Sequence, residues 1–227
     1  MEFGIFLSPL QRFHEERMLL DGLADYYEIF PSGEEDIELL QGEDCKFLVH
    51  LPEMDGPCFE TLELVRFLKV EKVVVHFKTK KEMEDDEKMS LLKRLLKRAG
   101  EYRVKVCLEN TIEDVETIRR VLEAIPGLMF CLDIGHANLF SNNPIDFLKA
   151  LSDRLEHIHL HDNFGGNSEK DDLHLPPGYG NINFKDLFLG LKSIEYDKTL
   201  TLEVSPRFPI DIRIESLRLI RTLLKEN

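Results

Sequence analysis

The sequence contains no tryptophan, only four cysteines, and no apolar run approaching the roughly 18 residues of a membrane span. The cysteines lack the CxxC spacing of a zinc knuckle and fall mostly in apolar, strand-like runs, at Cys45, Cys58, Cys107 and Cys131. Reduced, buried thiols are therefore favoured over disulfide bonds. The segment MEFGIFLSPL has neither the basic stretch nor the apolar run of a secretory signal. We therefore expect a cytoplasmic protein without a membrane segment.

Basic residues are also scarce relative to acidic ones. The chain has 29 lysines and arginines against 43 aspartates and glutamates, which gives a formal net charge of −14. Such a chain is repelled as a whole by phosphate backbones and anionic membranes. The balance disfavours nucleic acid as a partner and leaves a small molecule as the expected one. The oligomeric state is left open by the sequence.

Short β-branched runs alternate with longer amphipathic stretches along the 227 residues. Eight strands are predicted, at 2–8, 26–30, 45–51, 72–77, 104–110, 128–134, 156–162 and 199–205. Helical spacing of apolar residues lies between them, for example at 58–69, 87–99, 112–124, 184–194 and 211–225. The glycine-rich first turn of a doubly wound sheet is missing, since the first strand runs into FLSPL. We therefore predict the α/β class, as one (β/α)₈ TIM barrel domain over residues 1–227.

Metal-competent side chains end six of the eight predicted strands. The segment LEHIHLHDN places His157 and His159 on one face of a strand, because successive side chains alternate. The strand-end residues are His50, His76, Glu109, Asp133, His159 and Glu203. In a (β/α)₈ barrel such ends meet at one mouth. Burying so many ionisable groups costs several kcal/mol each unless they are paired or bind cations, so a divalent metal is predicted.

Two turns supply further candidate ligands. His136 follows Asp133 across a glycine in DIGHANL, and Asp172 and His174 lie in the long loop NFGGNSEKDDLHLPPGYGNINF. A loop of that length among short connections is typical of a functional site. Because one ion takes about four to six ligands, the nine candidates imply either two or three ions, or one ion with substrate-binding side chains. Imidazole with carboxylate suits zinc, manganese or iron, and we predict one to three ions of zinc or manganese.

The strings LENT, LDIGHA, HLHDN, DDLHLPPGYGNI and LEV resemble, in order and spacing, the xylose isomerase-like barrel superfamily. This superfamily contains sugar isomerases and epimerases together with endonuclease IV, of AP endonuclease family 2. The resemblance to the sugar branch implies one divalent ion held by Glu109, Asp133, His159 and Glu203. The resemblance to the endonuclease branch implies a trinuclear zinc site with the additional ligands His50, His76, His136, Asp172 and His174.

Some residues near the predicted mouth have no metal role in this interpretation. Glu28 and Asn110 fall at strand ends, where they would bind substrate hydroxyls or make loop hydrogen bonds. His161, one residue past its strand, would contact substrate or solvent, whereas His157 faces inward below the mouth and is predicted to be structural. The segment after His76 is FKTKKEM, which departs from the glycine- and serine-containing turn of the endonuclease branch.

Three functions fit these residues. In the first, Glu109 and Glu203 are the catalytic groups of an isomerase or epimerase that moves a proton of a sugar or sugar phosphate through an enediolate. In the second, zinc ions cleave a phosphodiester in apurinic or apyrimidinic DNA. In the third, the barrel binds metal without catalysis. The acidic charge and the lack of basic stripes favour the sugar enzyme over the nuclease.

Overall fold

The computed structural model describes residues 1–68, 70–140 and 142–226, and within them eight strands form one closed barrel. Each strand is parallel to its neighbours, and β8 closes the ring by pairing with β1. The strands are β1 (Glu2–Leu7), β2 (Tyr26–Ile29), β3 (Phe47–His50), β4 (Val70–His76), β5 (Lys105–Glu109), β6 (Met129–Asp133), β7 (Leu155–Leu160) and β8 (Thr199–Leu202). The predicted (β/α)₈ barrel is confirmed.

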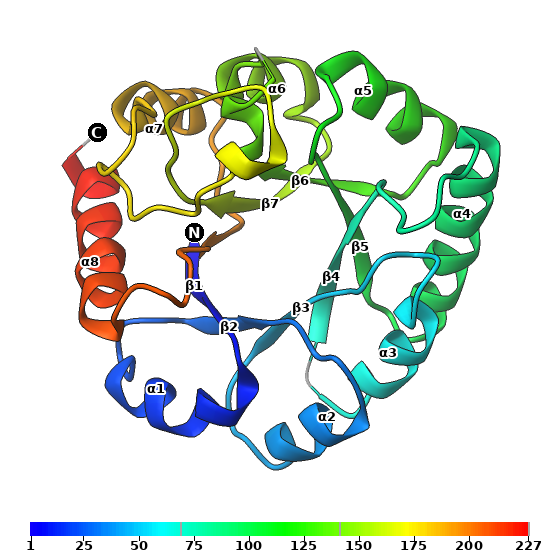
Figure 1. The fold of residues 1–227 in the computed structure, drawn as a ribbon, viewed down its shortest axis with the longest axis horizontal. Helices are drawn as coiled ribbons and strands as arrows, with labels where there is room; N and C mark the ends of the chain where they lie inside the picture. The colour runs from blue at the N-terminus through cyan, green and yellow to red at the C-terminus, as the bar shows by residue number, and fades with distance from the viewer. Residues whose placement is uncertain (69, 141, 227) are drawn as a thin grey trace.

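A helix follows each strand and covers the outside of the ring (Figure 1). The α-helices are α1 (Phe13–Leu19), α2 (Glu34–Leu40), α3 (Cys58–Val65), α4 (Asp85–Glu101), α5 (Val115–Ala124), α6 (Pro144–Leu151), α7 (Phe184–Ser193) and α8 (Ile210–Glu226). Three short 3₁₀ helices lie in the described connections, at Leu10–Arg12, His136–Asn138 and Glu169–Asp171. Among the described residues, no helix is both long and apolar enough to cross a bilayer.

Element ends differ from the predicted ones by a few residues, for local reasons. The helix predicted at 112–124 begins at Val115, because the Asp114 side chain accepts the Thr117 N–H at 2.8 Å and caps the first turn. The helix predicted at 58–69 ends at Val65, and residue 69 lies outside the described residues. The strand predicted at 199–205 ends at Leu202.

Alternation along the strands divides the buried residues into two layers. Outward-facing residues such as Ile158 and Leu160 join the large apolar layer between sheet and helices. The inward-facing apolar cluster is small, and it consists of Tyr26, Leu48, Val74, Cys107 and Cys131. All four cysteines are free, and three of them are buried.

Polar side chains fill much of the remaining barrel interior. The His157 Nδ1 lies 2.8 Å from the Thr199 hydroxyl, which also accepts a hydrogen bond from Lys72 Nζ at 3.0 Å. Lys72 is itself buried and donates to the buried Glu156 carboxylate at 3.1 Å. A buried charge is tolerated only when it is paired in this way. The interior is therefore a hydrogen-bonded column that rises from the strand starts toward the mouth.

Candidate metal centre

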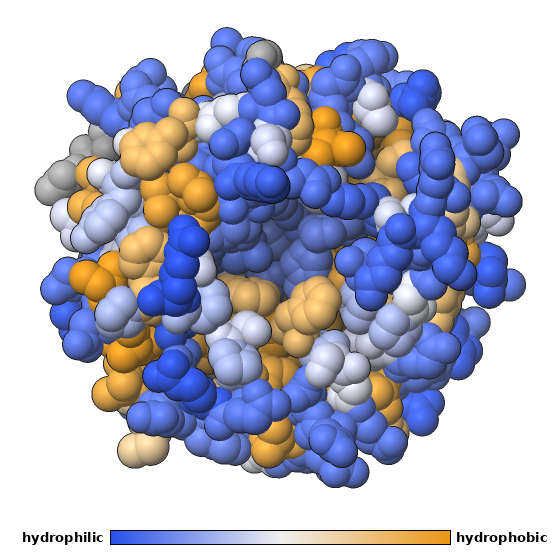
Figure 2. Space-filling view, in the orientation of Figure 1, coloured by the Kyte–Doolittle hydropathy of each residue, from blue (hydrophilic) through white to orange (hydrophobic). Residues whose placement is uncertain are grey.

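The carboxyl ends of the strands bring the predicted strand-end residues together at one mouth. Parallel pairing sets His76 beside Glu109, and Asp133 beside His159. Glu203 follows the last residue of β8, where its N–H donates to the Leu160 carbonyl at 3.0 Å. The centre of the ring is hollowed and hydrophilic in the space-filling view (Figure 2). The structure thus places the six strand-end side chains around one concave site.

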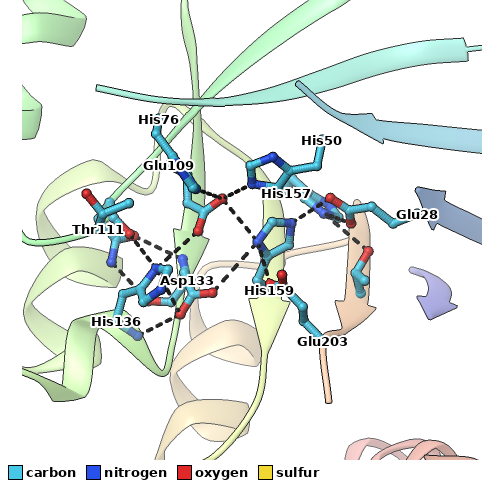
Figure 3. Close-up of polar contacts among 12 residues, drawn as sticks. Glu28, His50, His76, Glu109, Thr111, Asp133, His136, His157, His159 and Glu203 are labelled. Carbon is cyan, nitrogen blue, oxygen red and sulfur yellow. Dashed lines mark hydrogen bonds and ion pairs between the residues drawn. The ribbon is translucent and has the colours of Figure 1, made fainter. Parts of the chain in front are cut away.

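Glu109 is the central carboxylate of this site (Figure 3). Its Oε2 lies 3.0 Å from His50 Nε2, 3.3 Å from His76 Nε2 and 3.3 Å from His159 Nδ1. Its Oε1 lies 3.1 Å from His136 Nδ1. Four histidines from different strands and turns therefore surround one buried carboxylate, which is 1% exposed.

A second group forms around Asp172, in the long loop after β7. Asp172 Oδ2 lies 3.1 Å from His136 Nε2 and 3.0 Å from His174 Nε2. The buried His161 faces the other oxygen of this carboxylate, with Nε2 3.8 Å from Asp172 Oδ1. The turn histidine and the loop residues predicted from the sequence therefore do meet, and they are joined by a histidine that was assigned to substrate or solvent.

In their neutral form, which a metal ion would require, three of the histidines present an unprotonated nitrogen to the carboxylates. A backbone carbonyl only accepts hydrogen bonds, so a ring nitrogen beside one must carry a proton. In three of these rings the Nδ1 lies at 2.9 to 3.1 Å from a carbonyl oxygen: His50 beside Leu51, His136 beside Asn110 and His174 beside Glu203. In the neutral ring the Nε2 lone pair then faces a carboxylate. Metal-binding histidines have this arrangement, in which the distal N–H is held by a carbonyl or carboxylate.

His159 has the opposite orientation and a charged partner. Its Nε2 lies 2.8 Å from Glu28 Oε1, and its Nδ1 faces Glu203 Oε2 at 3.1 Å and Glu109 Oε2 at 3.3 Å. The other oxygen of Glu28 is 3.1 Å from His157 Nε2. A carboxylate that accepts a hydrogen bond from Nε2 keeps the proton on that nitrogen and leaves Nδ1 free to bind a metal ion. Glu28 therefore selects the tautomer of His159.

Several buried polar atoms at the mouth lack a hydrogen-bond partner among the described residues. They include both ring nitrogens of His161 and the atoms His76 Nε2, Asp133 Oδ2, His159 Nδ1, Asp172 Oδ1 and Glu203 Oε2. Buried polar atoms are normally satisfied, and leaving one unsatisfied costs about 1–3 kcal/mol. Lone pairs that converge in this way fit divalent cations, and imidazole with carboxylate suits zinc or manganese. The donor set therefore fits the predicted metal.

Opposite charges shift the pKa values of these groups. Burial alone raises the pKa of Glu109, but the charges of His159 and His76 and the hydrogen bonds from His136 and His159 together outweigh burial and hold the pKa well below its ordinary value. Burial lowers the pKa of His174, but its hydrogen bond to Asp172 and the negative charges of Glu203, Asp172 and Asp133 together outweigh burial and raise the pKa to about 9. Because a proton and a metal ion compete for the same lone pair, metal affinity at such a site rises with pH.

Two of the predicted substrate-binding residues are in other roles. Glu28 is fully buried, with each oxygen beside a histidine, so it does not reach the open mouth. Asn110 is also buried, because its amide donates to the Asp133 carbonyl at 3.0 Å and accepts the Asp133 N–H at 2.9 Å. The two Asn110 contacts hold the end of β6. Both side chains therefore make the hydrogen bonds that were the alternative to substrate binding, and a substrate-binding role for either residue stays a prediction.

A cavity of about 340 Å³ opens beside the clusters. Its wall includes His76, His136 and Asp172, so it borders both groups of candidate ligands. The wall also includes the apolar residues Ile112, Leu139 and Phe140, together with Thr111. Two charged wall residues, Lys78 and Glu169, form an ion pair. Its size lies at the lower end of the range for small-molecule pockets, about 300–1,000 Å³.

Comparisons with known proteins place the chain in a family. The chain is 28% identical to the uncharacterized protein MJ1614 of Methanocaldococcus jannaschii, over 95% of this chain and 96% of that protein. Its 34% identical match to MJ1311 of the same organism covers 52% of this chain and spans only 43% of that relative's length.

Two solved structures are similar over nearly the whole chain. A D-tagatose 3-epimerase-like protein shares 26% identity, with a TM-score of 0.81 over 99% of this chain and 97% of that one. The TTHB071 protein of Thermus thermophilus, soaked with ZnCl₂, shares 26% identity, with a TM-score of 0.77 over 100% and 99%. The family model described as a xylose isomerase-like TIM barrel matches residues 60–223. The chain therefore belongs to the xylose isomerase-like TIM barrel family.

Proposed function

We propose that the protein is a divalent-metal-dependent isomerase or epimerase that moves a proton next to the carbonyl of a sugar or sugar phosphate. The observation that carries the proposal is the convergence of two glutamates on His159, whose Nδ1 lies 3.1 Å from Glu203 Oε2 and 3.3 Å from Glu109 Oε2. Asp133 Oδ2 is 3.7 Å from the same nitrogen. These four residues would hold the ion.

A bound divalent ion would polarise the carbonyl and the neighbouring hydroxyl of the sugar. Glu109 and Glu203 then serve as the proton-transfer pair, one taking the proton from carbon and the other returning it. Their environments differ, because the Glu109 side chain is 1% exposed whereas that of Glu203 is 14% exposed. Glu203 is therefore the group that the substrate meets first.

The size and charge of the site support a small carbohydrate substrate. A cavity of about 340 Å³ leaves room for a monosaccharide rather than a polymer. The net charge of −14 disfavours binding to nucleic acid. The likeness to a D-tagatose 3-epimerase-like protein supports the reaction, and the likeness to a protein soaked with zinc chloride supports the metal.

Solvent isotope exchange tests this function. The metal-loaded protein is incubated in deuterated water with a panel of ketoses and ketose phosphates, and deuterium next to the carbonyl is followed by NMR. We expect incorporation with at least one substrate, and loss of it in Glu109→Gln and Glu203→Gln. Glu123→Gln, at an exposed glutamate of α5, is the matched control. Full exchange in either mouth variant would rule out the assigned pair.

A second candidate is hydrolysis of a phosphodiester in abasic DNA, favoured by the additional ligands around Glu109 and Asp172. His50, His76 and Glu109 have donor atoms within 4.8 Å of one another, as do Glu109, Asp133 and His159, so adjacent ions could be held. Two or more ions stabilise the attacking and leaving oxygens of such a reaction. We expect no specific incision of an abasic duplex at low salt with excess zinc, where electrostatic binding is strongest. Efficient incision, lost in His76→Ala, would replace the sugar reaction as the proposed function.

A further inference from the structure

His161 is a buried imidazole without a hydrogen bond. Its side chain is 0% exposed, and neither ring nitrogen has a hydrogen-bond partner within the described parts of the chain. Asp133 Oδ1 is 3.1 Å from its Nε2, but this contact lacks hydrogen-bond geometry, and that oxygen already accepts the His136 N–H at 2.6 Å. Burying an imidazole with no partner is costly. The ring therefore needs a ligand that the protein does not supply.

The surroundings of His161 define that ligand. One donor atom from each of His136, His161, Asp172 and His174 lies within 4.8 Å of the other three. The rings of His161 and His174 are stacked, with centroids 3.8 Å apart and planes 12° from parallel, so one ring must rotate before both can direct a lone pair at the same ion. His136 and His174 both direct Nε2 to Asp172 Oδ2, and Asp172 Oδ1 has no hydrogen-bond partner in the described chain.

We infer that His161 is the fourth protein ligand of a divalent ion, most suitably zinc, which His136, Asp172 and His174 also bind. Three imidazoles and one carboxylate fill a tetrahedral shell, as in structural zinc sites. Four protein ligands leave no position for water or a phosphate oxygen, so this ion is structural. The inference rests on the metal dependence proposed above, and it is independent of the sugar reaction.

Gly135 makes room for the His161 ring. A Cβ at position 135 would lie 1.9 Å from His161 Cε1, so any larger residue would push the ring out of place. The glycine has a helical φ of −68°, and therefore its small size rather than its backbone freedom is what the position requires. The turn between Asp133 and His136 is thus shaped around His161.

The loop after β7 carries the other two ligands and is fastened at its base. Asp162 Oδ2 accepts the N–H groups of Gly178 and Gly180 at 2.9 and 2.8 Å, and an antiparallel bridge joins Asp162 to Leu175. This segment, yellow in Figure 1, returns beside β7 before α7. An ion shared by the barrel end and the loop would therefore tie the loop over the mouth.

Metal stoichiometry tests this inference without any substrate. The wild-type protein, His161→Asn and the control His14→Asn are stripped with a chelator, reloaded with zinc, and analysed for metal per chain. His14 is an exposed histidine on α1, so the control repeats the substitution away from the mouth. We expect His161→Asn to bind one zinc fewer than wild type and the control to bind the full number. Equal binding by all three would overturn the inference.

Cobalt spectroscopy on wild-type protein tests the closed shell, and it does not depend on any variant folding. Four-coordinate Co²⁺ absorbs visible light much more strongly than six-coordinate Co²⁺. We expect at least one equivalent with the strong absorption, unchanged by added inorganic phosphate. If only weak absorption appears, or if phosphate alters all of the strong absorption, no closed centre exists. A lack of deuterium exchange with sugars would contradict the proposed reaction and would leave these metal results standing.

Discussion

Replacing Glu28 with glutamine tests how the barrel interior controls the metal. Glu28 lies below the mouth and accepts a hydrogen bond from His159 Nε2 at 2.8 Å. The unprotonated Nδ1 of His159 then faces Glu109 and Glu203. Glutamine has the same shape but no charge. Its carbonyl oxygen can still accept from His159, while its amide then faces His157.

The expected magnitude follows from these contacts. His157 can change tautomer because the Thr199 hydroxyl, 2.8 Å from its Nδ1, can accept a hydrogen bond as well as donate one. The hydrogen bonds can therefore be rebuilt, and the variant loses chiefly the negative charge behind His159. Loss of such an outer partner typically lowers metal affinity by about 10- to 100-fold. We expect the low end, about tenfold or about 1.4 kcal/mol, in Glu28→Gln.

Competition with a chromophoric chelator at constant pH measures the zinc affinity. Glu16→Gln is the matched control, because Glu16 is also a buried glutamate, paired with Arg213 at 2.7 Å near α1 and α8. We expect zinc affinity in the control to equal that of wild type. Unchanged affinity in Glu28→Gln, or an equal loss in both variants, would refute the role of Glu28 in orienting His159.

Two further predictions concern stability and metal content. Burial raises the pKa of Glu156, but the ammonium groups of Lys105 and Lys72 outweigh burial and lower it. This carboxylate therefore stabilises the fold fully above its unfolded pKa of about 4.3, and its contribution is lost as the pH falls below that value. Glu156→Gln should therefore unfold at a lower temperature than wild type at neutral pH, with chelator present in both samples, and the difference should shrink in acid; a pH-independent difference would contradict this assignment. Gly135→Ala should lose one zinc per chain, because its Cβ would lie 1.9 Å from His161 Cε1, and full zinc content by elemental analysis would show that the ring tolerates the clash.

The sequence predicted the barrel and the strand-end residues because both depend on local patterns. Apolar runs give the strands, and parallel pairing brings their carboxyl ends together, so His76, Glu109 and Asp133 could be assigned to one mouth. The depth of an inward-facing residue depends on the stagger between strands, which a single strand does not encode. Glu28 pairs in register with Leu48 of β3, one layer below the candidate ligands, and its strand alone does not distinguish this depth from the mouth.

The role proposed for His161 could not be predicted from the sequence, for a different reason. The residue comes directly after β7, and the direction of a side chain past a strand end depends on the turn that follows. The sequence contains one relevant signal, the glycine that directly precedes His136, because a glycine leaves space for a neighbouring buried ring. That signal gains meaning only when Gly135 and His161 are known to face each other across β6 and β7.

The fastening of the long loop at Asp162 has a consequence for how the family can diversify. Phe164 and residues 167–170 are exposed, and they lie between Asp162 and Leu175, which an antiparallel bridge joins. Glu169, within this stretch, lines the cavity beside the candidate metal ligands His76, His136 and Asp172. Substitutions or insertions at these exposed residues leave the strand pairing and the hydrogen bonds of Asp162 unchanged, while they alter the wall of the cavity. Selection for a new substrate can therefore act on this short surface segment without changes in the barrel.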